Sequence, residues 1–256
     1  MSEDRNPGVG LRRDGHVALL EFDRPPHNHV NVDLMRQLAD ALAVIDGEGE
    51  LRVSVLASRG RNFSAGADLA APSGLAGGVD ALYAEAMRLF SAKKPIVAAI
   101  QGAAVGAGLG LALVADFRIA TPESRFVANF VKLGFHPGFA ITHTLPRLIG
   151  PQKAALMCLT GRRITGAEAL QWGLVDGLAP LETLPEAALS LAREIAGNAP
   201  LAVEATRATL RAGLAAQAKA QMDAELAIQT ALRKTADFAE GVRAVAERRP
   251  GRFIGA

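Results

Sequence analysis

Two short stretches of small residues could do chemistry with their backbone rather than with their side chains. The first spans Asn62–Leu69 (NFSAGADL) and the second spans Gln101–Leu111 (QGAAVGAGLGL). Each follows an apolar run typical of a buried strand, and glycine and alanine at a strand exit let the backbone turn tightly against a ligand. Two such loops on neighbouring strands could direct one N–H group each at a single oxygen. That arrangement is an oxyanion hole, which suits thioester chemistry because charge builds there on a carbonyl oxygen.

Alternating strands and helices would place these loops. Apolar residues recur at helical spacing from Val32 to Ile45, and strand-like runs precede and follow this segment. The expected strands cover residues 16–22, 53–57, 95–100 and 116–120, and further helices cover 80–92 and 109–115. This alternation favours a parallel sheet with right-handed crossovers. Beyond residue 151 the pattern is almost entirely helical, with helices expected at 152–159, 167–172, 185–196, 201–212 and 216–234.

Composition narrows the class of protein. The 256 residues are 50% hydrophobic, which allows one large core, and the net charge of +2 is too small to indicate a nucleic-acid partner. Cys158 is the single cysteine, so no intrachain disulfide can form. The first fifteen residues lack an apolar signal segment, and no apolar run reaches the ~20 residues of a membrane span. We therefore expect a cytoplasmic protein with no membrane partner.

Several other functions are disfavoured by spacing. The run from Gly106 to Gly110 is G-x-G-x-G rather than the G-x-G-x-x-G of dinucleotide-binding turns. No loop carries the Gly-Lys-Ser/Thr of a P-loop, and no G-x-S-x-G nucleophile motif is present. Cysteine, histidine and carboxylate residues are not clustered at metal-ligand spacing, so no metal site is expected.

The order of motifs resembles the crotonase (enoyl-CoA hydratase/isomerase) superfamily. FSAGADL is followed by a Lys-Pro strand, by G-x-x-x-G-A-G and by ADFRIA. The segments LTGRRITGAEA and WGLVD follow, and the chain closes with DFAEGVR and RPGRF. The resemblance covers about residues 16–253, nearly the whole chain.

That resemblance implies a ββα spiral core over residues 1–195 and a C-terminal helical trimerisation region over 196–256. It also implies an acyl-CoA thioester as ligand, no cofactor beyond the coenzyme A of the substrate, and a homotrimer or a dimer of trimers. The oxyanion N–H groups are expected at Ala67 and Ala107. The remaining residues expected to contact substrate are Ala65, Asp68, Leu69, Gly106, Gly108, Phe130, Gly138 and Arg24, the last through a CoA phosphate.

The sequence departs from the family at the acid–base positions. The two glutamates of the hydratases correspond to Gly110 and Phe130, and the later carboxylate of some isomerases corresponds to Gly138. A positioned acid or base contributes about 10²–10⁴-fold to a rate, so losing these groups should cripple ordinary hydration. His136 is the candidate replacement, because histidine titrates near neutrality. Among the other histidines, His143 lies early in an expected helix, and His27 and His29 lie in the proline-rich loop expected near the CoA entrance.

Two kinds of function therefore stay open. One is an enzyme, for which enoyl-CoA hydratase is the leading label and enoyl-CoA isomerase, thioester hydrolysis or decarboxylation are alternatives. The other is a CoA-thioester-binding protein without a chemical step, which the loss of both glutamates favours.

Overall fold

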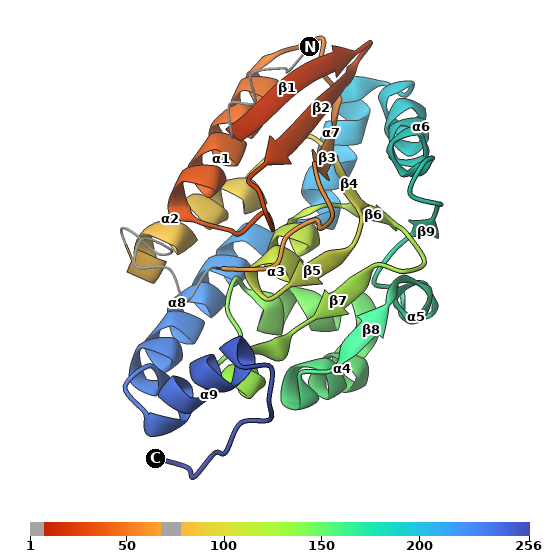
Figure 1. Ribbon diagram of the computed structural model, residues 1–256. Helices are drawn as coiled ribbons and strands as arrows, with labels where there is room; N and C mark the ends of the chain where they lie inside the picture. The colour runs from red at the N-terminus through yellow and green to blue at the C-terminus, as the bar shows by residue number, and fades with distance from the viewer. Residues whose placement is uncertain (1–7, 68–77) are drawn as a thin grey trace.

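A six-stranded sheet forms the upper part of the molecule in Figure 1, a computed structural model that describes residues 8–67 and 78–256. Its spatial order is β1 (Gly8–Asp14), β2 (Val17–Asp23), β3 (Val53–Ser58), β4 (Ile96–Ile100), β6 (Phe117–Ala120) and β9 (Gly177–Leu178). Strand β1 pairs with β2 in an antiparallel hairpin, and every later pairing is parallel. The carboxyl ends of β3 and β4 therefore lie side by side, and both small-residue loops leave from there.

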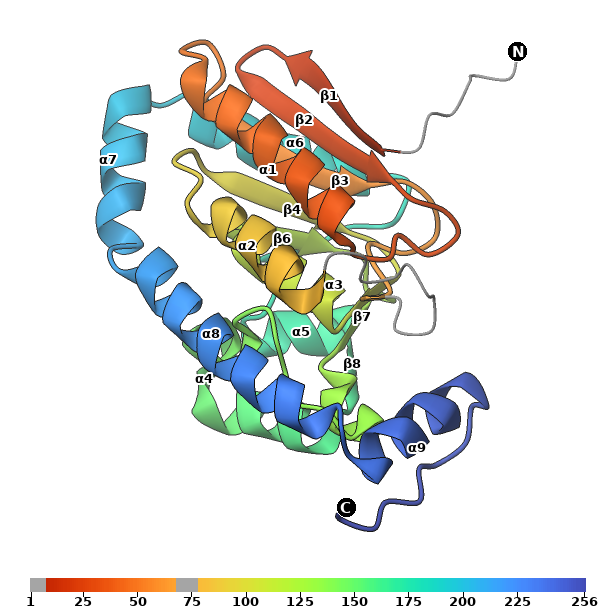
Figure 2. The same ribbon diagram turned by 90° about the vertical axis from the view of Figure 1, so that its left-hand side faces the viewer.

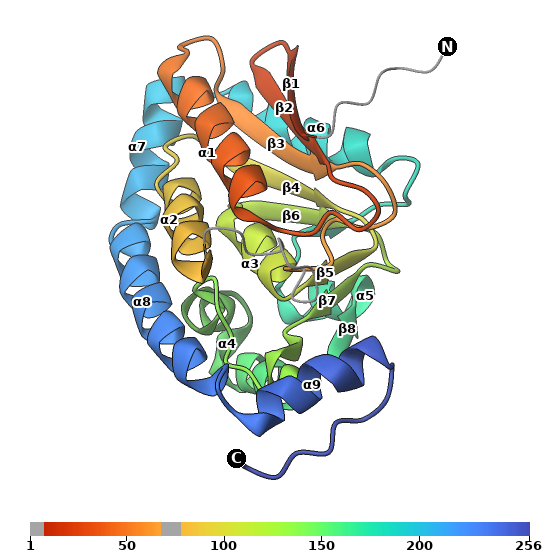
Figure 3. The same cartoon turned by 60° about the vertical axis from the view of Figure 1, so that its left-hand side comes forward.

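Helices cover both faces of this sheet, as Figure 3 shows. Helices α1 (Val32–Gly47) and α2 (Gly78–Phe90) lie on one face and α6 (Leu184–Ala196) lies on the other. Successive side chains of a strand point to opposite faces. In β4, accordingly, Ile96 and Ala98 pack in the core beneath α1 and α2, while Val97 packs with the buried alanines of α6. All five residues of β4 are buried, as expected for a central parallel strand.

A second, three-stranded sheet continues from the small-residue loops. Its order is β5 (Ala103–Val105), β7 (Arg125–Val127) and β8 (Arg163–Thr165), with α3 (Ala107–Val114) following β5 directly. Strands β5 and β7 are parallel, and β7 and β8 are antiparallel. This sheet holds the second loop in an extended form up to the first turn of α3.

The remaining helices build the lower part of the molecule and one side of it. The 3-10 helix η1 (Asn129–Leu133) precedes α4 (Ile141–Thr160), and α5 (Gly166–Trp172) follows β8. Figure 2 shows α7 (Pro200–Leu210) and α8 (Leu214–Leu232) running along one side, with α9 (Ala236–Ala246) at the end opposite the β1–β2 hairpin. Helix α8 packs against α2 and α4, and α9 packs against η1. The C-terminal region thus packs against α2, α4 and η1.

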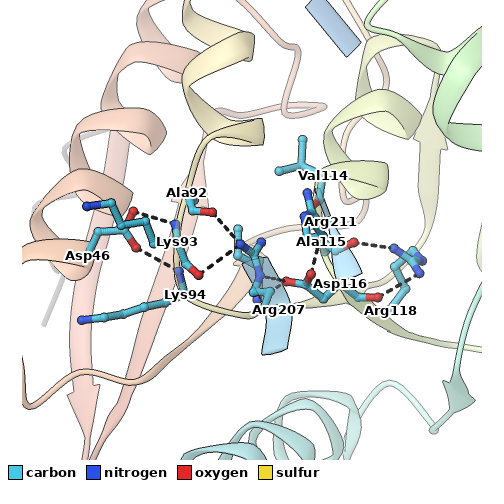
Figure 4. Close-up of polar contacts among 11 residues, drawn as sticks. Asp46, Ala92, Lys93, Lys94, Val114, Ala115, Asp116, Arg118, Arg207 and Arg211 are labelled. Carbon is cyan, nitrogen blue, oxygen red and sulfur yellow. Dashed lines mark hydrogen bonds and ion pairs between the residues drawn. The ribbon is translucent and has the colours of Figure 1, made fainter. Parts of the chain in front are cut away.

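Asp116 ties α7 to the edge of the main sheet (Figure 4). Its carboxylate accepts hydrogen bonds from Arg207 Nε and Arg211 Nη1, each at 2.9 Å, and from the backbone N–H of Ile96 at 2.8 Å. Arg207 Nη1 also donates to the carbonyl oxygen of Ala92 at 2.6 Å. Asp116 and both arginines are largely buried, so removing either sign of charge would leave the other buried without a partner.

The predicted α/β class with a helical C-terminal region is confirmed. The expected helix at 152–159 matches the part of α4 after its kink at Gly150, where φ is +78°, and the part from Ile141 to the kink begins, as expected, shortly before His143. Strand β1, the second sheet and α9 had no counterpart among the expected elements. Over residues 8–67 and 78–256, no helix is long and apolar enough to cross a membrane.

Candidate functional site

The two small-residue loops lie against each other as a short parallel pair. Ser64 N donates to the carbonyl oxygen of Ala103 at 2.9 Å, and Val105 N donates to the carbonyl oxygen of Ser64 at 3.0 Å. Ser64 is therefore paired with Ala104. Gly66 allows this approach, because its φ is +88° and a Cβ there would lie 2.7 Å from the carbonyl oxygen of Val105.

The backbone N–H groups of Ala67 and Ala107 have no hydrogen-bond acceptor within the described part of the chain. Ala107 is the first residue of α3, where a helical N–H has no partner inside the helix. The dipole of the helix adds partial positive charge at this end. A Cβ on Gly66 would lie 3.8 Å from Ala107 N, so the two loops meet close to this donor. Both alanines line the same cavity.

This cavity has a volume of about 260 Å³ and is walled mainly by apolar side chains. The two loops form one side, and α2, η1, the segment 135–139, the end of α8 and α9 form the rest. Five polar side chains reach its wall: His29, Tyr83, Asn129, Gln229 and Arg233. A largely apolar cavity with a few converging polar groups is the usual form of a small-molecule site. Of the described residues, no aspartate or glutamate lines it.

Gly110 and Gly138 stand at two positions where the family resemblance implies a carboxylate. Side chains of other residues fill the space next to both glycines. A Cβ on Gly110 would lie 2.6 Å from Cβ and Cγ of Phe139. A Cβ on Gly138 would lie 1.8 Å from the hydroxyl oxygen of Tyr83 and 2.5 Å from Gln229 Nε2. Phe130 contributes its own ring to the cavity wall. A side chain at either glycine would therefore require its neighbours to move.

Tyr83 and Gln229 form a buried polar pair at the cavity. The Tyr83 hydroxyl donates to Gln229 Oε1 at 3.0 Å, and Gln229 Nε2 donates to the carbonyl oxygen of His136 at 2.9 Å. Burial, with a smaller contribution from the charge of Glu225, raises the pKa of Tyr83 further above its ordinary value. The phenol is therefore neutral near pH 7 and acts as a hydrogen-bond donor.

His29 is the histidine that the structure brings to the cavity wall. Its Nδ1 lies 3.0 Å from the carbonyl oxygen of Gly66. A carbonyl can only accept a hydrogen bond, so the neutral ring carries its proton on Nδ1 and leaves Nε2 as an acceptor. This places a potential base next to the first small-residue loop.

The structure brings together six of the residues expected from the sequence. Ala65, Ala67, Gly106, Ala107, Phe130 and Gly138 all line the cavity. Asp68 and Leu69 lie outside the described residues.

Three expected residues do not reach the cavity wall. Arg24 Nη1 donates to the carbonyl oxygen of His29 at 2.9 Å, and His136 Nδ1 lies 2.7 Å from the carbonyl oxygen of Pro137. Gly108 packs the two loops together, because a Cβ there would lie 2.5 Å from the carbonyl oxygen of Ser64.

Tyr83, Gln229 and Arg233 were missed as site residues. They belong to α2 and to the end of α8, about 150 residues apart in the chain, and local motifs cannot connect them. One signal was present, because Gln229 is a polar residue on a face of α8 that also carries Ala218 and Met222. All three of these side chains are buried.

No group of three or more histidine, cysteine, aspartate or glutamate residues that could hold a metal occurs in the described ranges. The described wall of the cavity offers backbone N–H groups, one phenol, one imidazole, two amides and one guanidinium.

Comparisons with known proteins all point to one family. The family model described as enoyl-CoA hydratase/isomerase matches residues 12–255. A protein of Escherichia coli K12 named 2,3-dehydroadipyl-CoA hydratase is 35% identical over 249 residues, covering 96% of this chain and 98% of the relative. Carnitinyl-CoA dehydratase of Salmonella typhi is 35% identical over 207 residues, covering 79% of each chain.

Solved structures agree. The enoyl-CoA hydratase/isomerase of Pseudoalteromonas atlantica T6c superposes with a TM-score of 0.87 at 29% identity, covering 96% of this chain and all of that one. The carnitinyl-CoA hydratase of Mycobacterium avium gives a TM-score of 0.86 at 30% identity, covering 98% of this chain and all of that one. The crotonase-like fold predicted from the sequence is thereby confirmed.

Proposed function

The chain belongs to the enoyl-CoA hydratase/isomerase family, and from this premise we propose that its cavity binds an acyl-CoA thioester with the carbonyl oxygen between the N–H groups of Ala67 and Ala107. The observation that carries the proposal is the pairing of the two loops, whose N–H groups at these positions have no acceptor within the described residues. Such donors stabilise an oxygen that gains charge during the reaction.

Hydration of a 2-enoyl-CoA is the reaction we assign first. Water adds its hydroxyl group to C3 and a proton is delivered to C2, while the negative charge between these steps lies on the thioester oxygen. Relatives named as hydratases and dehydratases of CoA thioesters support this assignment. Isomerisation moves the double bond of a 3-enoyl-CoA from C3–C4 to C2–C3. Its intermediate carries the same negative charge on the thioester oxygen, so isomerisation is the second reaction to test.

Tyr83 and His29 are our candidates for moving protons in place of carboxylates. Tyr83 is a phenol on the cavity wall, and to protonate C2 it would have to give up its hydrogen bond to Gln229. His29 lies on the same wall, and with Nδ1 donating to Gly66 its neutral ring leaves Nε2 to accept a proton from water. His136 remains the candidate from the sequence, and its carbonyl group, rather than its ring, contacts this network through Gln229.

The first experiment removes one oxyanion donor without removing a side chain. Proline is tolerated at the first position of a helix and has no N–H, so Ala107→Pro should keep α3 and lose the donor. We expect kcat on 2-enoyl-CoA substrates to fall by about 10²–10³-fold. Ala107→Ser, which keeps the N–H, is the matched control. Equal activity of folded Ala107→Pro and wild type would overturn the proposal.

A second experiment assigns the proton carriers. Wild type, Tyr83→Phe, His29→Gln and His136→Ala are assayed on a panel of 2-enoyl-CoA and 3-enoyl-CoA substrates. Loss of a proton carrier should lower kcat by about 10²–10⁴-fold with little change in KM. If His136→Ala alone has this effect, the sequence-based candidate replaces Tyr83 and His29.

A binding function without chemistry is the second candidate. It is favoured by one observation, namely that no described aspartate or glutamate lines the cavity. Micromolar or tighter binding of CoA thioesters, together with no turnover of any member of the panel, would establish it.

We also propose that the protein assembles as a homotrimer or a dimer of trimers. Leu201 and Leu210 of α7 are 80% and 75% exposed, which leaves apolar surface for a contact between subunits. Light scattering during size-exclusion chromatography would give the mass directly, and a 26.7 kDa particle would contradict assembly.

A further inference from the structure

One guanidinium lines the cavity without a negatively charged partner. Arg233 follows the last turn of α8, four residues after Gln229, and its charged carbon lies 5.2 Å from the centre of the Phe135 ring. Within the described residues it makes no ion pair, and its Nε is buried without a hydrogen-bond partner. Arg207 and Arg211 are different, since they share the carboxylate of Asp116.

This lack of a partner has an energetic cost that a ligand could remove. Burial lowers the pKa of Arg233, although a guanidinium stays charged throughout the physiological range. A partly buried charge without a partner destabilises the empty protein. The negative groups whose charge acts on it are Asp80 and, when ionised, Tyr83, and neither forms an ion pair with it. A negatively charged ligand atom would supply the missing partner.

The surroundings of Arg233 indicate which kind of anion fits. Ala67, Ala107 and Arg233 line one cavity, whose wall also carries apolar side chains such as Leu82 and Phe135. Apolar walls suit a methylene chain, and the planar guanidinium suits the two oxygens of a carboxylate. A ligand with a thioester at one end and a carboxylate at the other would satisfy both ends of the cavity.

We propose that the acyl group accepted by this protein carries a carboxylate at the end remote from the thioester, and that Arg233 binds this carboxylate. The inference rests on the proposed function, because it takes the thioester oxygen to lie at Ala67 and Ala107. A phosphate of coenzyme A has similar charge, and the experiment separates these two sources of an anion.

The test compares saturated thioesters that differ only in the terminal carboxylate. Calorimetry measures the Kd of butyryl- and succinyl-CoA, hexanoyl- and adipyl-CoA, and octanoyl- and suberyl-CoA with wild type, Arg233→Met, Arg233→Lys and Lys234→Met. We expect the dicarboxylate to bind about 10- to 100-fold more tightly than its partner at one chain length or more. Arg233→Met should abolish that preference and Arg233→Lys should keep part of it. Lys234→Met, at the exposed neighbouring position, should leave it unchanged.

Three outcomes would overturn the inference. The first is equal affinity within every pair. The second is a preference for the dicarboxylate that persists in folded Arg233→Met. The third is an equal loss of affinity for both thioesters of a pair in Arg233→Met, provided that this loss disappears when the same acyl groups are presented on pantetheine. The partner of Arg233 would then be a CoA phosphate. If wild type binds no thioester of either kind, the proposed function itself has failed.

Discussion

Gly110 shows how one missing Cβ shapes the cavity. Inside a helix, alanine ordinarily stabilises a protein by about 1 kcal/mol relative to glycine. At position 110, however, that Cβ would lie 2.6 Å from Phe139, and overpacking costs about 1–3 kcal/mol. We expect Gly110→Ala to lower the free energy of unfolding by about 1–2 kcal/mol in urea titrations. Gly47→Ala at the exposed end of α1, where a Cβ would meet nothing within 4 Å, should not destabilise.

Introducing a carboxylate at Gly138 should destabilise the fold for a related reason. The Cβ of Gly138→Asp would overlap the Tyr83 hydroxyl oxygen at 1.8 Å, whereas the next ring atom, Cζ, is 3.1 Å away. Tyr83→Phe removes the overlapping oxygen, so it should relieve part of the damage. A double-mutant cycle of unfolding free energies should give a coupling of about 1 kcal/mol or more in favour of the double variant. Additive effects would contradict this packing.

At the residue scale, the sequence predicted the backbone part of the site better than the side-chain part. Ala67 and Ala107 could be placed because a local motif fixes where a strand ends and a loop turns. Tyr83 and Arg233 reach the cavity only through packing between distant helices. No motif in the sequence encodes that packing.

At the element scale, α7 depends on Asp116. Replacing its carboxylate leaves two largely buried arginines without their shared partner, and breaking such a pair costs about 3–5 kcal/mol. Asp116→Ala should therefore lower the free energy of unfolding by that amount in denaturant titrations. Glu194→Ala, on the exposed surface of α6, is the control and should change it by less than about 0.5 kcal/mol. A small effect of Asp116→Ala would show that water can replace the carboxylate.

Glu225 of α8 should make stability depend on pH. It accepts hydrogen bonds from Ala140 N and from Thr142, and it holds Ala140 at a φ of +55°. Burial raises its pKa to about 7, above the 4.5 of an exposed glutamate. The folded protein therefore binds this proton more tightly than the unfolded chain. Its contribution to stability is complete below about pH 4.5 and falls by up to about 3 kcal/mol as the pH rises through 7.

The measurement compares wild type with Glu225→Gln. Free energies of unfolding at pH 5, 6, 7 and 8 should fall more steeply for wild type between pH 5 and 7. Parallel profiles for the two proteins would show that the carboxyl group is already ionised throughout this range.

Element prediction succeeded where periodicity is strong and failed where elements are short. Helix α1 was found because its buried residues recur at helical spacing, and its cap at Asn31 agrees with its start. Strands β5, β7 and β8 have three residues each, too few to show alternation. Helix α9 was not among the expected helices, because its residues entered only as a family motif. Its Thr235 cap was nevertheless visible in the sequence.

At the scale of the whole molecule, the docking of α9 onto η1 completes the cavity. Val242, Val245 and Ala246 line it, and Gly241 contacts η1 so closely that a Cβ would lie 2.4 Å from Leu133 C. Gly241→Val should displace α9 and weaken thioester binding by tenfold or more while the sheet stays folded. Calorimetry and circular dichroism would measure the two effects. Ala239→Val, at an exposed position of the same helix, should bind as wild type does.

The cavity wall begins at His29 and ends at Ala246, so almost the full chain must emerge from the ribosome before a ligand can be held. A nascent chain that ends before α9 has both loops but lacks Val242, Val245 and Ala246 from the cavity wall. Ligand added during synthesis should consequently protect from proteolysis only chains that include α9, since stabilisation by a ligand requires the complete binding site.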